Sequence, residues 1–398
     1  TIGGEPSQLF LDGQRGERVR SVREVGAPGT WHYEPASGGL TVAGGVGSDP
    51  PSVEVSLRNH CFEASGRGSF VLDRLCLRRG AWHTLHVVGC RNFEITRCEI
   101  EGSFVNGVWL QSDAPSIFVV LRRNIIRDCG GSGISLGGRI AECIIEDNTI
   151  SRCCQLHEDV PGPAAKVAQL EWSAGIKGWG WGVIGWHGAV TVEGNHITEC
   201  RPHVWAGGSK EPHKRGSGIW WDEVIAPSAR QVIRRNIIED CQSRGIYIEK
   251  SDDCDVDYNA VIDCATVDYC GGLALQANSA GYDVTTQTAA VFPRSACRNR
   301  FRNNTVVGGW WGLEAIASTP SATLENNQFI NNIFVSASRQ SIYAIGGAAN
   351  EGGLGSNNLY QNNCFGEEHS GLGRWGSKAH ATYDALEAAG SGAISESV

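Results

Sequence analysis

The sequence has no long run of apolar residues: none of its 398 residues belongs to a stretch approaching the roughly 20 apolar positions of a membrane-spanning helix. It also has no cluster of Lys and Arg, and its formal net charge is −9. Nucleic acids and acidic lipid surfaces bind basic patches, so the sequence argues against both partners and, more weakly, against a strongly polyanionic substrate.

An LxxLxL run is missing, and a 3.6-residue apolar period is almost absent before the last thirty residues, which argues against leucine-rich and helical repeats.

The cysteines form no paired CxxC motif of the kind that binds zinc, and their count of fifteen is odd. The only adjacent pair is Cys153 and Cys154. We therefore expect most of these residues to be small buried hydrophobic side chains, although neighbouring thiols of a repeat could lie close enough to oxidise.

An Asn followed five residues later by a Cys occurs five times. The pairs are Asn124/Cys129, Asn148/Cys153, Asn195/Cys200, Asn236/Cys241 and Asn259/Cys264. Self-similar segments at a spacing of roughly 22 to 27 residues are typical of a solenoid, and the longer gaps indicate the same unit with an insertion.

Each repeat unit has the pattern of strands and turns. Residues 235–238 and 245–249 are short runs of alternating apolar residues, bounded by Gly, Asn, Asp and Ser. Stacked strands with sharp corners predict an all-β fold, a parallel β-helix solenoid. An inward Asn at each corner would bond backbone groups of the neighbouring rungs.

The chain is predicted to be one elongated body in three parts. Residues 1–60 read as irregular N-terminal coils or a cap, 61–364 as the β-helix and 365–398 as a C-terminal cap and tail. Long loop insertions are expected near 154–174, 201–216 and 277–297, where loops of this length are usually functional. A short helix over 381–389 would cover the open end of the coil, where strand edges are otherwise unpaired.

Aligning the rungs on one Gly separates inward from outward positions. The alignment uses Gly107, Gly133, Gly175, Gly218, Gly245, Gly272 and Gly312. The first and third residues after each Gly are mostly apolar and should point inward, so the second and fourth should point outward. The second positions are His86 (with a one-residue shift), Trp109, Ser135, Lys177, Trp220, Tyr247, Ala274 and Glu314; the fourth are Gln111, Gly137, Trp179, Asp222, Glu249, Gln276 and Ile316.

Two carboxylates therefore fall in one outward column on consecutive rungs, Asp222 and Glu249. Parallel strands lie about 4.8 Å apart, so the carboxyl groups should be roughly 5 Å apart. That separation is typical of a retaining glycosidase. Two like charges this close push their pKa values apart, which leaves one group as an acid and the other as a nucleophile.

The surroundings of this pair suit a sugar. Seven of thirteen Trp residues lie between 172 and 221. The candidate substrate-binding residues are Lys177, Trp179, Trp220, Tyr247, Glu171, His213, Gln276 and Trp109. Several have an ordinary alternative: the Trp residues could pack the 178–182 loop onto the coil, Lys177 could form a surface salt bridge, and His213 could belong to a solvated charge run.

Other polar residues carry weaker signals. Asp252, Asp253 and Asp255 resemble a calcium-ligand cluster, but alternating Asp at a solvated corner is the more common structure. No cofactor is otherwise expected. His60 and His83 have no partner that the sequence identifies.

The segments around the two carboxylates resemble a known family. Ala174-Gly175-Ile176-Lys177, Gly218-Ile219-Trp220-Trp221-Asp222, Asn236 to Cys241 and Gly245 to Ser251 are similar to the core of right-handed β-helix proteins of the pectate-lyase-like superfamily. They are most similar to β-helix glycosidases that include a β-xylosidase family. The resemblance implies a right-handed coil in which Asp222 is the nucleophile and Glu249 the general acid.

The sequence thus predicts a carbohydrate-active enzyme, a glycoside hydrolase that acts on an oligosaccharide or polysaccharide. A lyase or epimerase on the same fold is the first alternative and would need a basic residue such as Lys177, Lys250 or Arg215. A non-catalytic glycan-binding module is the second, because this scaffold hosts all three functions.

Cellular location and assembly are less determined by the sequence. A polysaccharide substrate slightly favours a secreted or periplasmic protein, whereas fifteen unpaired cysteines favour a reducing interior. Thr1 is not preceded by a signal-peptide pattern, so we expect a processed or partial product. An oligomer is compatible with the sequence.

Overall fold

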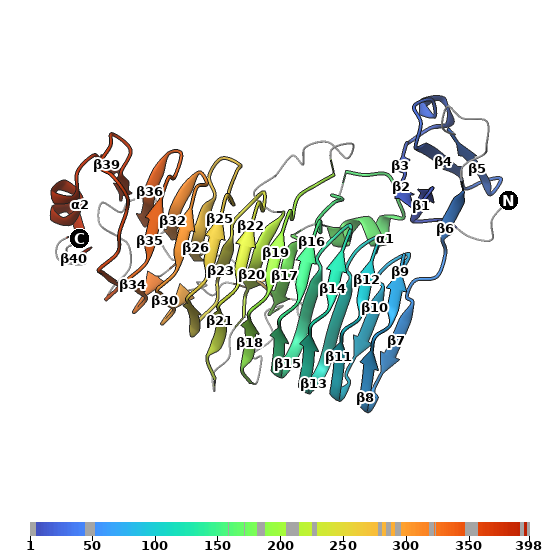
Figure 1. Ribbon diagram of the computed structural model, residues 1–398, viewed down its shortest axis with the longest axis horizontal. Helices are drawn as coiled ribbons and strands as arrows, with labels where there is room; N and C mark the ends of the chain where they lie inside the picture. The colour runs from blue at the N-terminus through green and yellow to red at the C-terminus, as the bar shows by residue number, and fades with distance from the viewer. Residues whose placement is uncertain are drawn as a thin grey trace.

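The computed structural model shows a parallel β-helix, with coils stacked along the long axis of the molecule (Figure 1). The structure describes residues 5–43, 52–157, 159–170, 172–180, 188–203, 215–224, 229–277, 281–283, 288–290, 296–317, 322, 324–346, 357–390 and 394–395. The predicted all-β parallel fold is confirmed.

Three walls of parallel strands, here called faces A, B and C, form the coil; faces A and B belong to one sheet, and face C is a second sheet. Face A contains β7 (Phe62–Ser65), β10 (Leu85–Val88), the start of β13 (Val108–Arg122), the start of β15 (Ile134–Glu146), β17 (Ala174–Trp179), β20 (Ser217–Asp222), β23 (Ile246–Glu249), β26 (Gly271–Ala277), β32 (Trp311–Ala317), β36 (Gln340–Gly346) and β38 (Gly373–Trp375). Because β13 and β15 continue around a corner, they join faces A and B.

The other two faces repeat the same parallel order. Face B contains β8 (Gly68–Asp73), β11 (Arg91–Thr96), the ends of β13 and β15, β18 (Val190–Glu193), β21 (Gln231–Arg234), β24 (Cys254–Asp257), β30 (Arg300–Arg302), β34 (Gln328–Ile330), β37 (Leu359–Gln361) and β40 (Ile394–Ser395). Face C contains β9 (Cys76–Arg78), β12 (Glu99–Glu101), β14 (Ile125–Arg127), β16 (Thr149–Ser151), β19 (His196–Thr198), β22 (Ile237–Glu239), β25 (Ala260–Ile262), β31 (Thr305–Val307) and β35 (Ile333–Val335).

Buried apolar side chains from all three faces fill the inside of the coil. A ladder of Asn residues runs beside them at one corner: Asn124, Asn148, Asn195, Asn236, Asn259, Asn304, Asn332 and Asn363. From Asn148 onward, each Asn amide oxygen accepts the backbone N–H of the preceding Asn at 3.0 Å, as the repeat predicts, and the amide oxygen of Asn124 accepts the backbone N–H of Cys98 at 2.9 Å. The cysteines of the repeat are buried in the core, and all fifteen cysteines are free thiols.

Both ends of the coil carry additional structure. The N-terminal strands are β1 (Gln8–Leu11), β2 (Gln14–Arg15), β3 (Glu17–Arg18), β4 (Thr30–Glu34), β5 (Gly39–Val42) and β6 (Val53–Ser56), with a 3₁₀ turn η1 (Val22–Glu24). Gln8 donates to the carbonyls of Gly80 and Gly102, so this unit packs on the corner that follows face C. At the other end lies α2 (Tyr383–Gly390), the predicted capping helix (Figure 1). Its residue Leu386 belongs to the main hydrophobic core.

The remaining elements belong to loops and to the last coil. They are α1 (Ala164–Val167), η2 (Ala168–Leu170), the hairpin β27 (Gly281–Asp283) and β28 (Thr288–Ala290), the pair β29 (Ala296–Cys297) and β33 (Leu324–Glu325), and β39 (Lys378–His380). The expected insertion near 154–174 is anchored by a small core of Phe104, Val105, Leu156, Val160 and Leu170. Within the described residues, no helix is long and apolar enough to cross a membrane. The boundaries at 60/61 and 364/365 stay a prediction.

Candidate active site

Glycines allow the strands of face A to approach their neighbours closely, because they have no Cβ. A Cβ added to Gly218 would lie 2.3 Å from Ile238 Cγ2 and 2.6 Å from the carbonyl oxygen of Gly245. Gly175 and Gly245 meet the same restriction from the next rung. The glycine alignment therefore has a steric cause, and it fixes the register of the strands that follow each Gly.

That register brings the two predicted catalytic residues together. Asp222 ends β20 and Glu249 ends β23, and the two residues are direct partners of parallel strands. Lys177 of β17 is the partner of Trp220, and Trp179 is the partner of Asp222. The two outward columns therefore have the predicted order. The two carboxylates lie on adjacent strands, and such strands are about 4.8 Å apart.

Two lysines neutralise the carboxylates. Lys177 Nζ lies 3.1 Å from Asp222 Oδ2. On the other side, Lys250 Nζ lies 3.4 Å from Asp222 Oδ1, 3.1 Å from Glu223 Oε1 and 3.7 Å from Glu249 Oε1. The sequence offered Lys250 only as an alternative base, and the structure places it beside three carboxylates.

The two carboxyl groups have pKa values displaced in opposite directions. Burial alone would raise the pKa of Asp222, but the charges and hydrogen bonds of Lys177 and Lys250 outweigh burial and hold this pKa below its ordinary value. Burial and the neighbouring Asp222 charge raise the pKa of Glu249. The site therefore favours an ionised Asp222 beside a Glu249 that keeps its proton more readily.

The pKa of Lys177 is also shifted from its ordinary value. Its side chain has no exposed surface, and burial lowers its pKa to about 8, partly offset by Asp222 and Glu249. Its Nζ lies 3.1 Å from the centre of the Trp220 ring, a cation–π contact. This ammonium group is therefore positioned by an aromatic face as well as by a carboxylate.

Trp220 and Tyr247 are packed, whereas the outward alternation suggested open sugar platforms. Only 1% of Trp220 is exposed, and its ring lies 5.0 Å from that of Tyr247 and 5.7 Å from that of Trp172. Trp220 Nε1 donates to Glu249 Oε2 at 3.2 Å. Trp220 is therefore a packed residue that contacts the Glu249 carboxyl group through its N–H and Lys177 through its ring.

Gln276 is the next member of the Asp222 column and accepts the hydroxyl hydrogen bond of Tyr247. Tyr247 also lies under the guanidinium carbon of Arg244, 4.2 Å from the ring centre. Arg244 forms a buried ion pair with Glu314 at 2.7 Å, and the sequence alignment did not pair these residues. The sequence held a clue to this ion pair, because Glu314 is the acidic residue among the outward second positions.

The remaining predicted residues lie elsewhere. Trp109 is separated from Lys177 by the rung of Ser135, and its ring stacks on His83 at 5.1 Å. Glu171 and His213 lie outside the described residues. Trp179 lies near the site, with its ring centre 4.8 Å from Lys177 Nζ.

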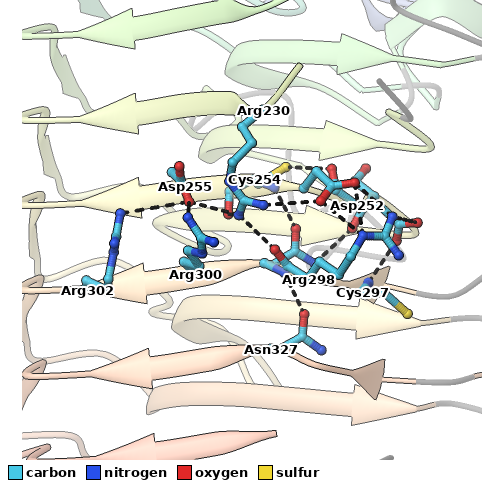
Figure 2. Close-up of polar contacts among 12 residues, drawn as sticks. Arg230, Asp252, Cys254, Asp255, Cys297, Arg298, Arg300, Arg302 and Asn327 are labelled. Carbon is cyan, nitrogen blue, oxygen red and sulfur yellow. Dashed lines mark hydrogen bonds and ion pairs between the residues drawn. The ribbon is translucent and has the colours of Figure 1, made fainter. Parts of the chain in front are cut away.

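The acidic run that leads into β24 is paired with arginines, as Figure 2 shows. Arg298 contacts Asp252 at 3.2 Å and Asp253 at 2.8 Å, and Arg230 contacts Asp255 at 2.8 Å. The oxygen atoms that a calcium ion would need therefore face guanidinium groups, and we propose no calcium site at Asp252, Asp253 and Asp255.

Comparison with solved structures gives distant similarities. The chain is similar to XylC in its complex with xylose, with 14% identity and a TM-score of 0.44, over 83% of this chain and 56% of that chain. It is also similar to the A-module of the mannuronan C-5 epimerase AlgE6 from Azotobacter vinelandii, with 13% identity and a TM-score of 0.33, over 77% and 74% of the two chains. For the Dettilon tailspike protein the identity is 15% and the TM-score 0.37, over 73% and 59%. No curated protein matches the sequence.

A family match covers most of the coil. Residues 83–365 match the family described as a right-handed β-helix region. This range contains the strands of face A from β10 to β36, including both carboxylates. The chain therefore belongs to the right-handed parallel β-helix family.

Proposed function

We propose that this protein is a glycoside hydrolase that cleaves an oligosaccharide or polysaccharide by a retaining, two-carboxylate mechanism. The observation that carries the proposal is the pairing of Asp222 and Glu249 on adjacent rungs, with their pKa values displaced in opposite directions. Adjacent strands lie about 4.8 Å apart, so we expect the carboxyl groups of these direct partners to be roughly 5 Å apart, the separation of a retaining glycosidase, in which one carboxylate attacks the anomeric carbon directly.

The first step forms a bond between an Asp222 oxygen and the anomeric carbon while the glycosidic C–O bond breaks. Glu249 gives its proton to the departing oxygen. In the second step Glu249, now ionised, takes a proton from water, and the resulting hydroxide attacks the anomeric carbon. As this bond forms, the bond between the anomeric carbon and the Asp222 oxygen breaks, which leaves Asp222 ionised and Glu249 protonated, as they were at the start.

The lysines match these roles. Lys177 and Lys250 contact Asp222 from two sides and keep it ionised for attack. Lys250 Nζ is more distant from Glu249, at 3.7 Å, than from Glu223. The indole N–H of Trp220 holds the Glu249 carboxyl group in place.

One observation favours a second candidate, a lyase or epimerase. Burial lowers the pKa of Lys177 to about 8, which would suit a base that removes the proton beside a uronate carboxylate. Lys177 would have to act beside Asp222, whose negative charge opposes binding of a uronate. We therefore rank this candidate second.

The test compares wild type, Asp222→Asn and Glu249→Gln on a panel of neutral and acidic glycans. Reducing ends and the ultraviolet absorbance of a new C=C bond are followed together, and the anomeric configuration of the first product is read by NMR. We expect reducing ends with retained configuration, reduced at least about 100-fold in either variant. The control is Glu239→Gln/Asp240→Asn, two exposed carboxylates on the far corner of face C that pair with His196 and Arg201.

Each other outcome contradicts the proposal in its own way. Absorbance of a C=C bond would identify a lyase, and inverted configuration would exclude Asp222 as a nucleophile. Binding of a glycan with no turnover by the wild type would identify a non-catalytic module.

A further inference from the structure

Three side chains with metal-binding atoms meet at the N-terminal end of face A. His60 precedes β7, Glu63 lies in β7, and His86 lies in β10 as the direct partner of Glu63. They lie on the outward side of the strands, at the start of the column that continues through Trp109 to Lys177. The distance to Lys177 is three rungs, roughly 14 Å, so this cluster is separate from the candidate active site.

The ligand atoms are close enough to share one ion. One atom from each of the three side chains lies within 4.8 Å of the other two. Glu63 Oε1 is 3.4 Å from His86 Nδ1, longer than a good hydrogen bond. Two ligands at about 2.1 Å from a tetrahedral metal are separated by about 3.4 Å, which is the spacing seen here.

The second ring nitrogen of His60 is already engaged. His60 Nδ1 lies 3.1 Å from the backbone oxygen of His83. A carbonyl oxygen only accepts, so Nδ1 carries the hydrogen and Nε2 keeps its lone pair. This is the arrangement that fixes the tautomer of a metal-binding histidine.

Ring contacts hold the imidazoles in place. The His60 ring is stacked on His83 with an interplanar angle of 7°, and its centre is 4.6 Å from that of His86. The two histidines that would bind the ion therefore lie beside each other on neighbouring rungs.

We propose that His60, Glu63 and His86 bind a divalent transition-metal ion of the zinc class, with a fourth coordination position left open. Two imidazoles and one carboxylate suit Zn²⁺ and its neighbours rather than Ca²⁺, which prefers oxygen ligands alone. Three protein ligands with one free position is the pattern of an accessible rather than a closed structural site. The Glu63 side chain is 57% exposed, so an ion can reach these ligands from solvent.

The experiment titrates the full chain with Co²⁺ and follows its visible absorbance, and then displaces Co²⁺ with Zn²⁺. It uses a Cys61→Ser/Cys76→Ser background, because these two thiols are exposed and could bind the probe. We expect one Co²⁺ per chain, displaced by Zn²⁺ and not by Ca²⁺. Zn²⁺ should also raise the Tm, because it binds only the folded chain.

The variants locate the ion. Glu63→Gln removes one ligand from an exposed side chain, so folding should be preserved, and we expect affinity to fall at least about tenfold. His86→Gln should reduce it further. His196→Gln is the matched control: His196 also contacts a carboxylate, Glu239 at 2.7 Å, and should leave affinity unchanged.

Several results would overturn the assignment. Absence of stoichiometric binding to the wild-type chain would remove the site. Affinity unchanged in Glu63→Gln, or equal losses in Glu63→Gln and His196→Gln, would place the ion elsewhere. These measurements need no glycan, so the metal site and the proposed hydrolase activity fail or succeed independently.

Discussion

Lys177 and Asp222 form an ion pair across adjacent strands, 3.1 Å from Nζ to Oδ2, and the lysine side chain has no exposed surface. The pair is diagonal, because the direct partner of Lys177 is Trp220. Lys177 therefore reaches over the Trp220 ring to the carboxylate beyond it. Burying a cation is costly unless it is paired, so this geometry indicates that Asp222 and the aromatic ring together retain the charge.

Removing this cation should move the pH dependence of activity. The Lys177 charge lowers the pKa of Asp222 and, less strongly, that of Glu249. In Lys177→Gln both pKa values should rise, so both limbs of the kcat/KM profile should shift to higher pH, and the maximum should fall roughly tenfold. The measurement is a pH–rate profile on a neutral glycan.

Lys166→Gln is the control for this profile. Lys166 is a half-buried lysine whose pKa is also lowered by burial. Its Nζ contacts the hydroxyl of Ser7, far from the two carboxylates. It should leave both limbs in place. A Lys177→Gln profile that loses height without moving would contradict the electrostatic role given to Lys177.

The two carboxylates should respond differently to the leaving group. Glu249 acts on the departing oxygen, so Glu249→Gln should retain most of its first-step rate on aryl glycosides with acidic phenols and lose it on natural linkages. Asp222→Asn should be inactive on both, because no substrate replaces the nucleophile. Rates measured over a series of phenols check this, and equal losses in the two variants would show that the roles are not divided this way.

The register of this site was predictable from the sequence, because Gly218, Gly245 and Gly272 are evenly spaced and each needs the same close approach to the next rung. Alternation from those glycines placed Asp222 beside Glu249 correctly. Exposure was not predictable in this way. A side chain that points outward is exposed to solvent only if side chains of neighbouring rungs do not cover it. Trp220 is covered by Trp172, Tyr247 and Lys177.

Long-range charge pairing was also hidden. The Asp252 to Asp255 run looked like a local ligand cluster, yet its partners include Arg298, 45 or 46 positions further along the chain. Likewise, His60 has no identifiable partner in its own segment, and His86 reaches it only because β10 stacks on β7. Sequence patterns reveal which face a residue occupies, whereas such contacts depend on which loops bring two rungs together.

Glu249 should make stability depend on pH. Its pKa in the folded chain is raised, so its contribution to stability is present below the unfolded pKa and is lost as pH rises through the folded pKa. Glu249→Gln removes this loss. The Tm of the variant should therefore exceed that of wild type by an amount that grows between pH 4 and pH 8, as measured by scanning calorimetry.

Glu193→Gln supplies a control of opposite sign. Glu193 ends β18, and its hydrogen bonds and ion pairs with Arg234 and Arg235 lower its pKa. Its stabilising contribution is present above the unfolded pKa and is lost as pH falls. The variant should therefore be less stable than wild type at neutral pH, with a difference that shrinks toward pH 4. The same pH trend in both variants would contradict the raised pKa of Glu249.

Gly218→Ala should disturb the fold and the site together. The added Cβ would lie 2.6 Å from the carbonyl oxygen of Gly245, which is backbone and cannot move without displacing β23. Overpacking of this kind costs about 1–3 kcal/mol. It would also separate Asp222 from Glu249, since Gly218 is the second residue of β20 and Gly245 immediately precedes β23, so kcat should fall by more than the folded fraction does.

Gly26→Ala separates this steric effect from the general effect of replacing a glycine. No atom lies within 4 Å of a Cβ built at Gly26, and its residue is exposed in an N-terminal turn. Denaturant unfolding should therefore show a change of no more than about 0.5 kcal/mol in this variant. If Gly218→Ala were equally mild, the close approach of Gly218 to Gly245 would not require a glycine, and the fixed register that pairs the two carboxylates would need another cause.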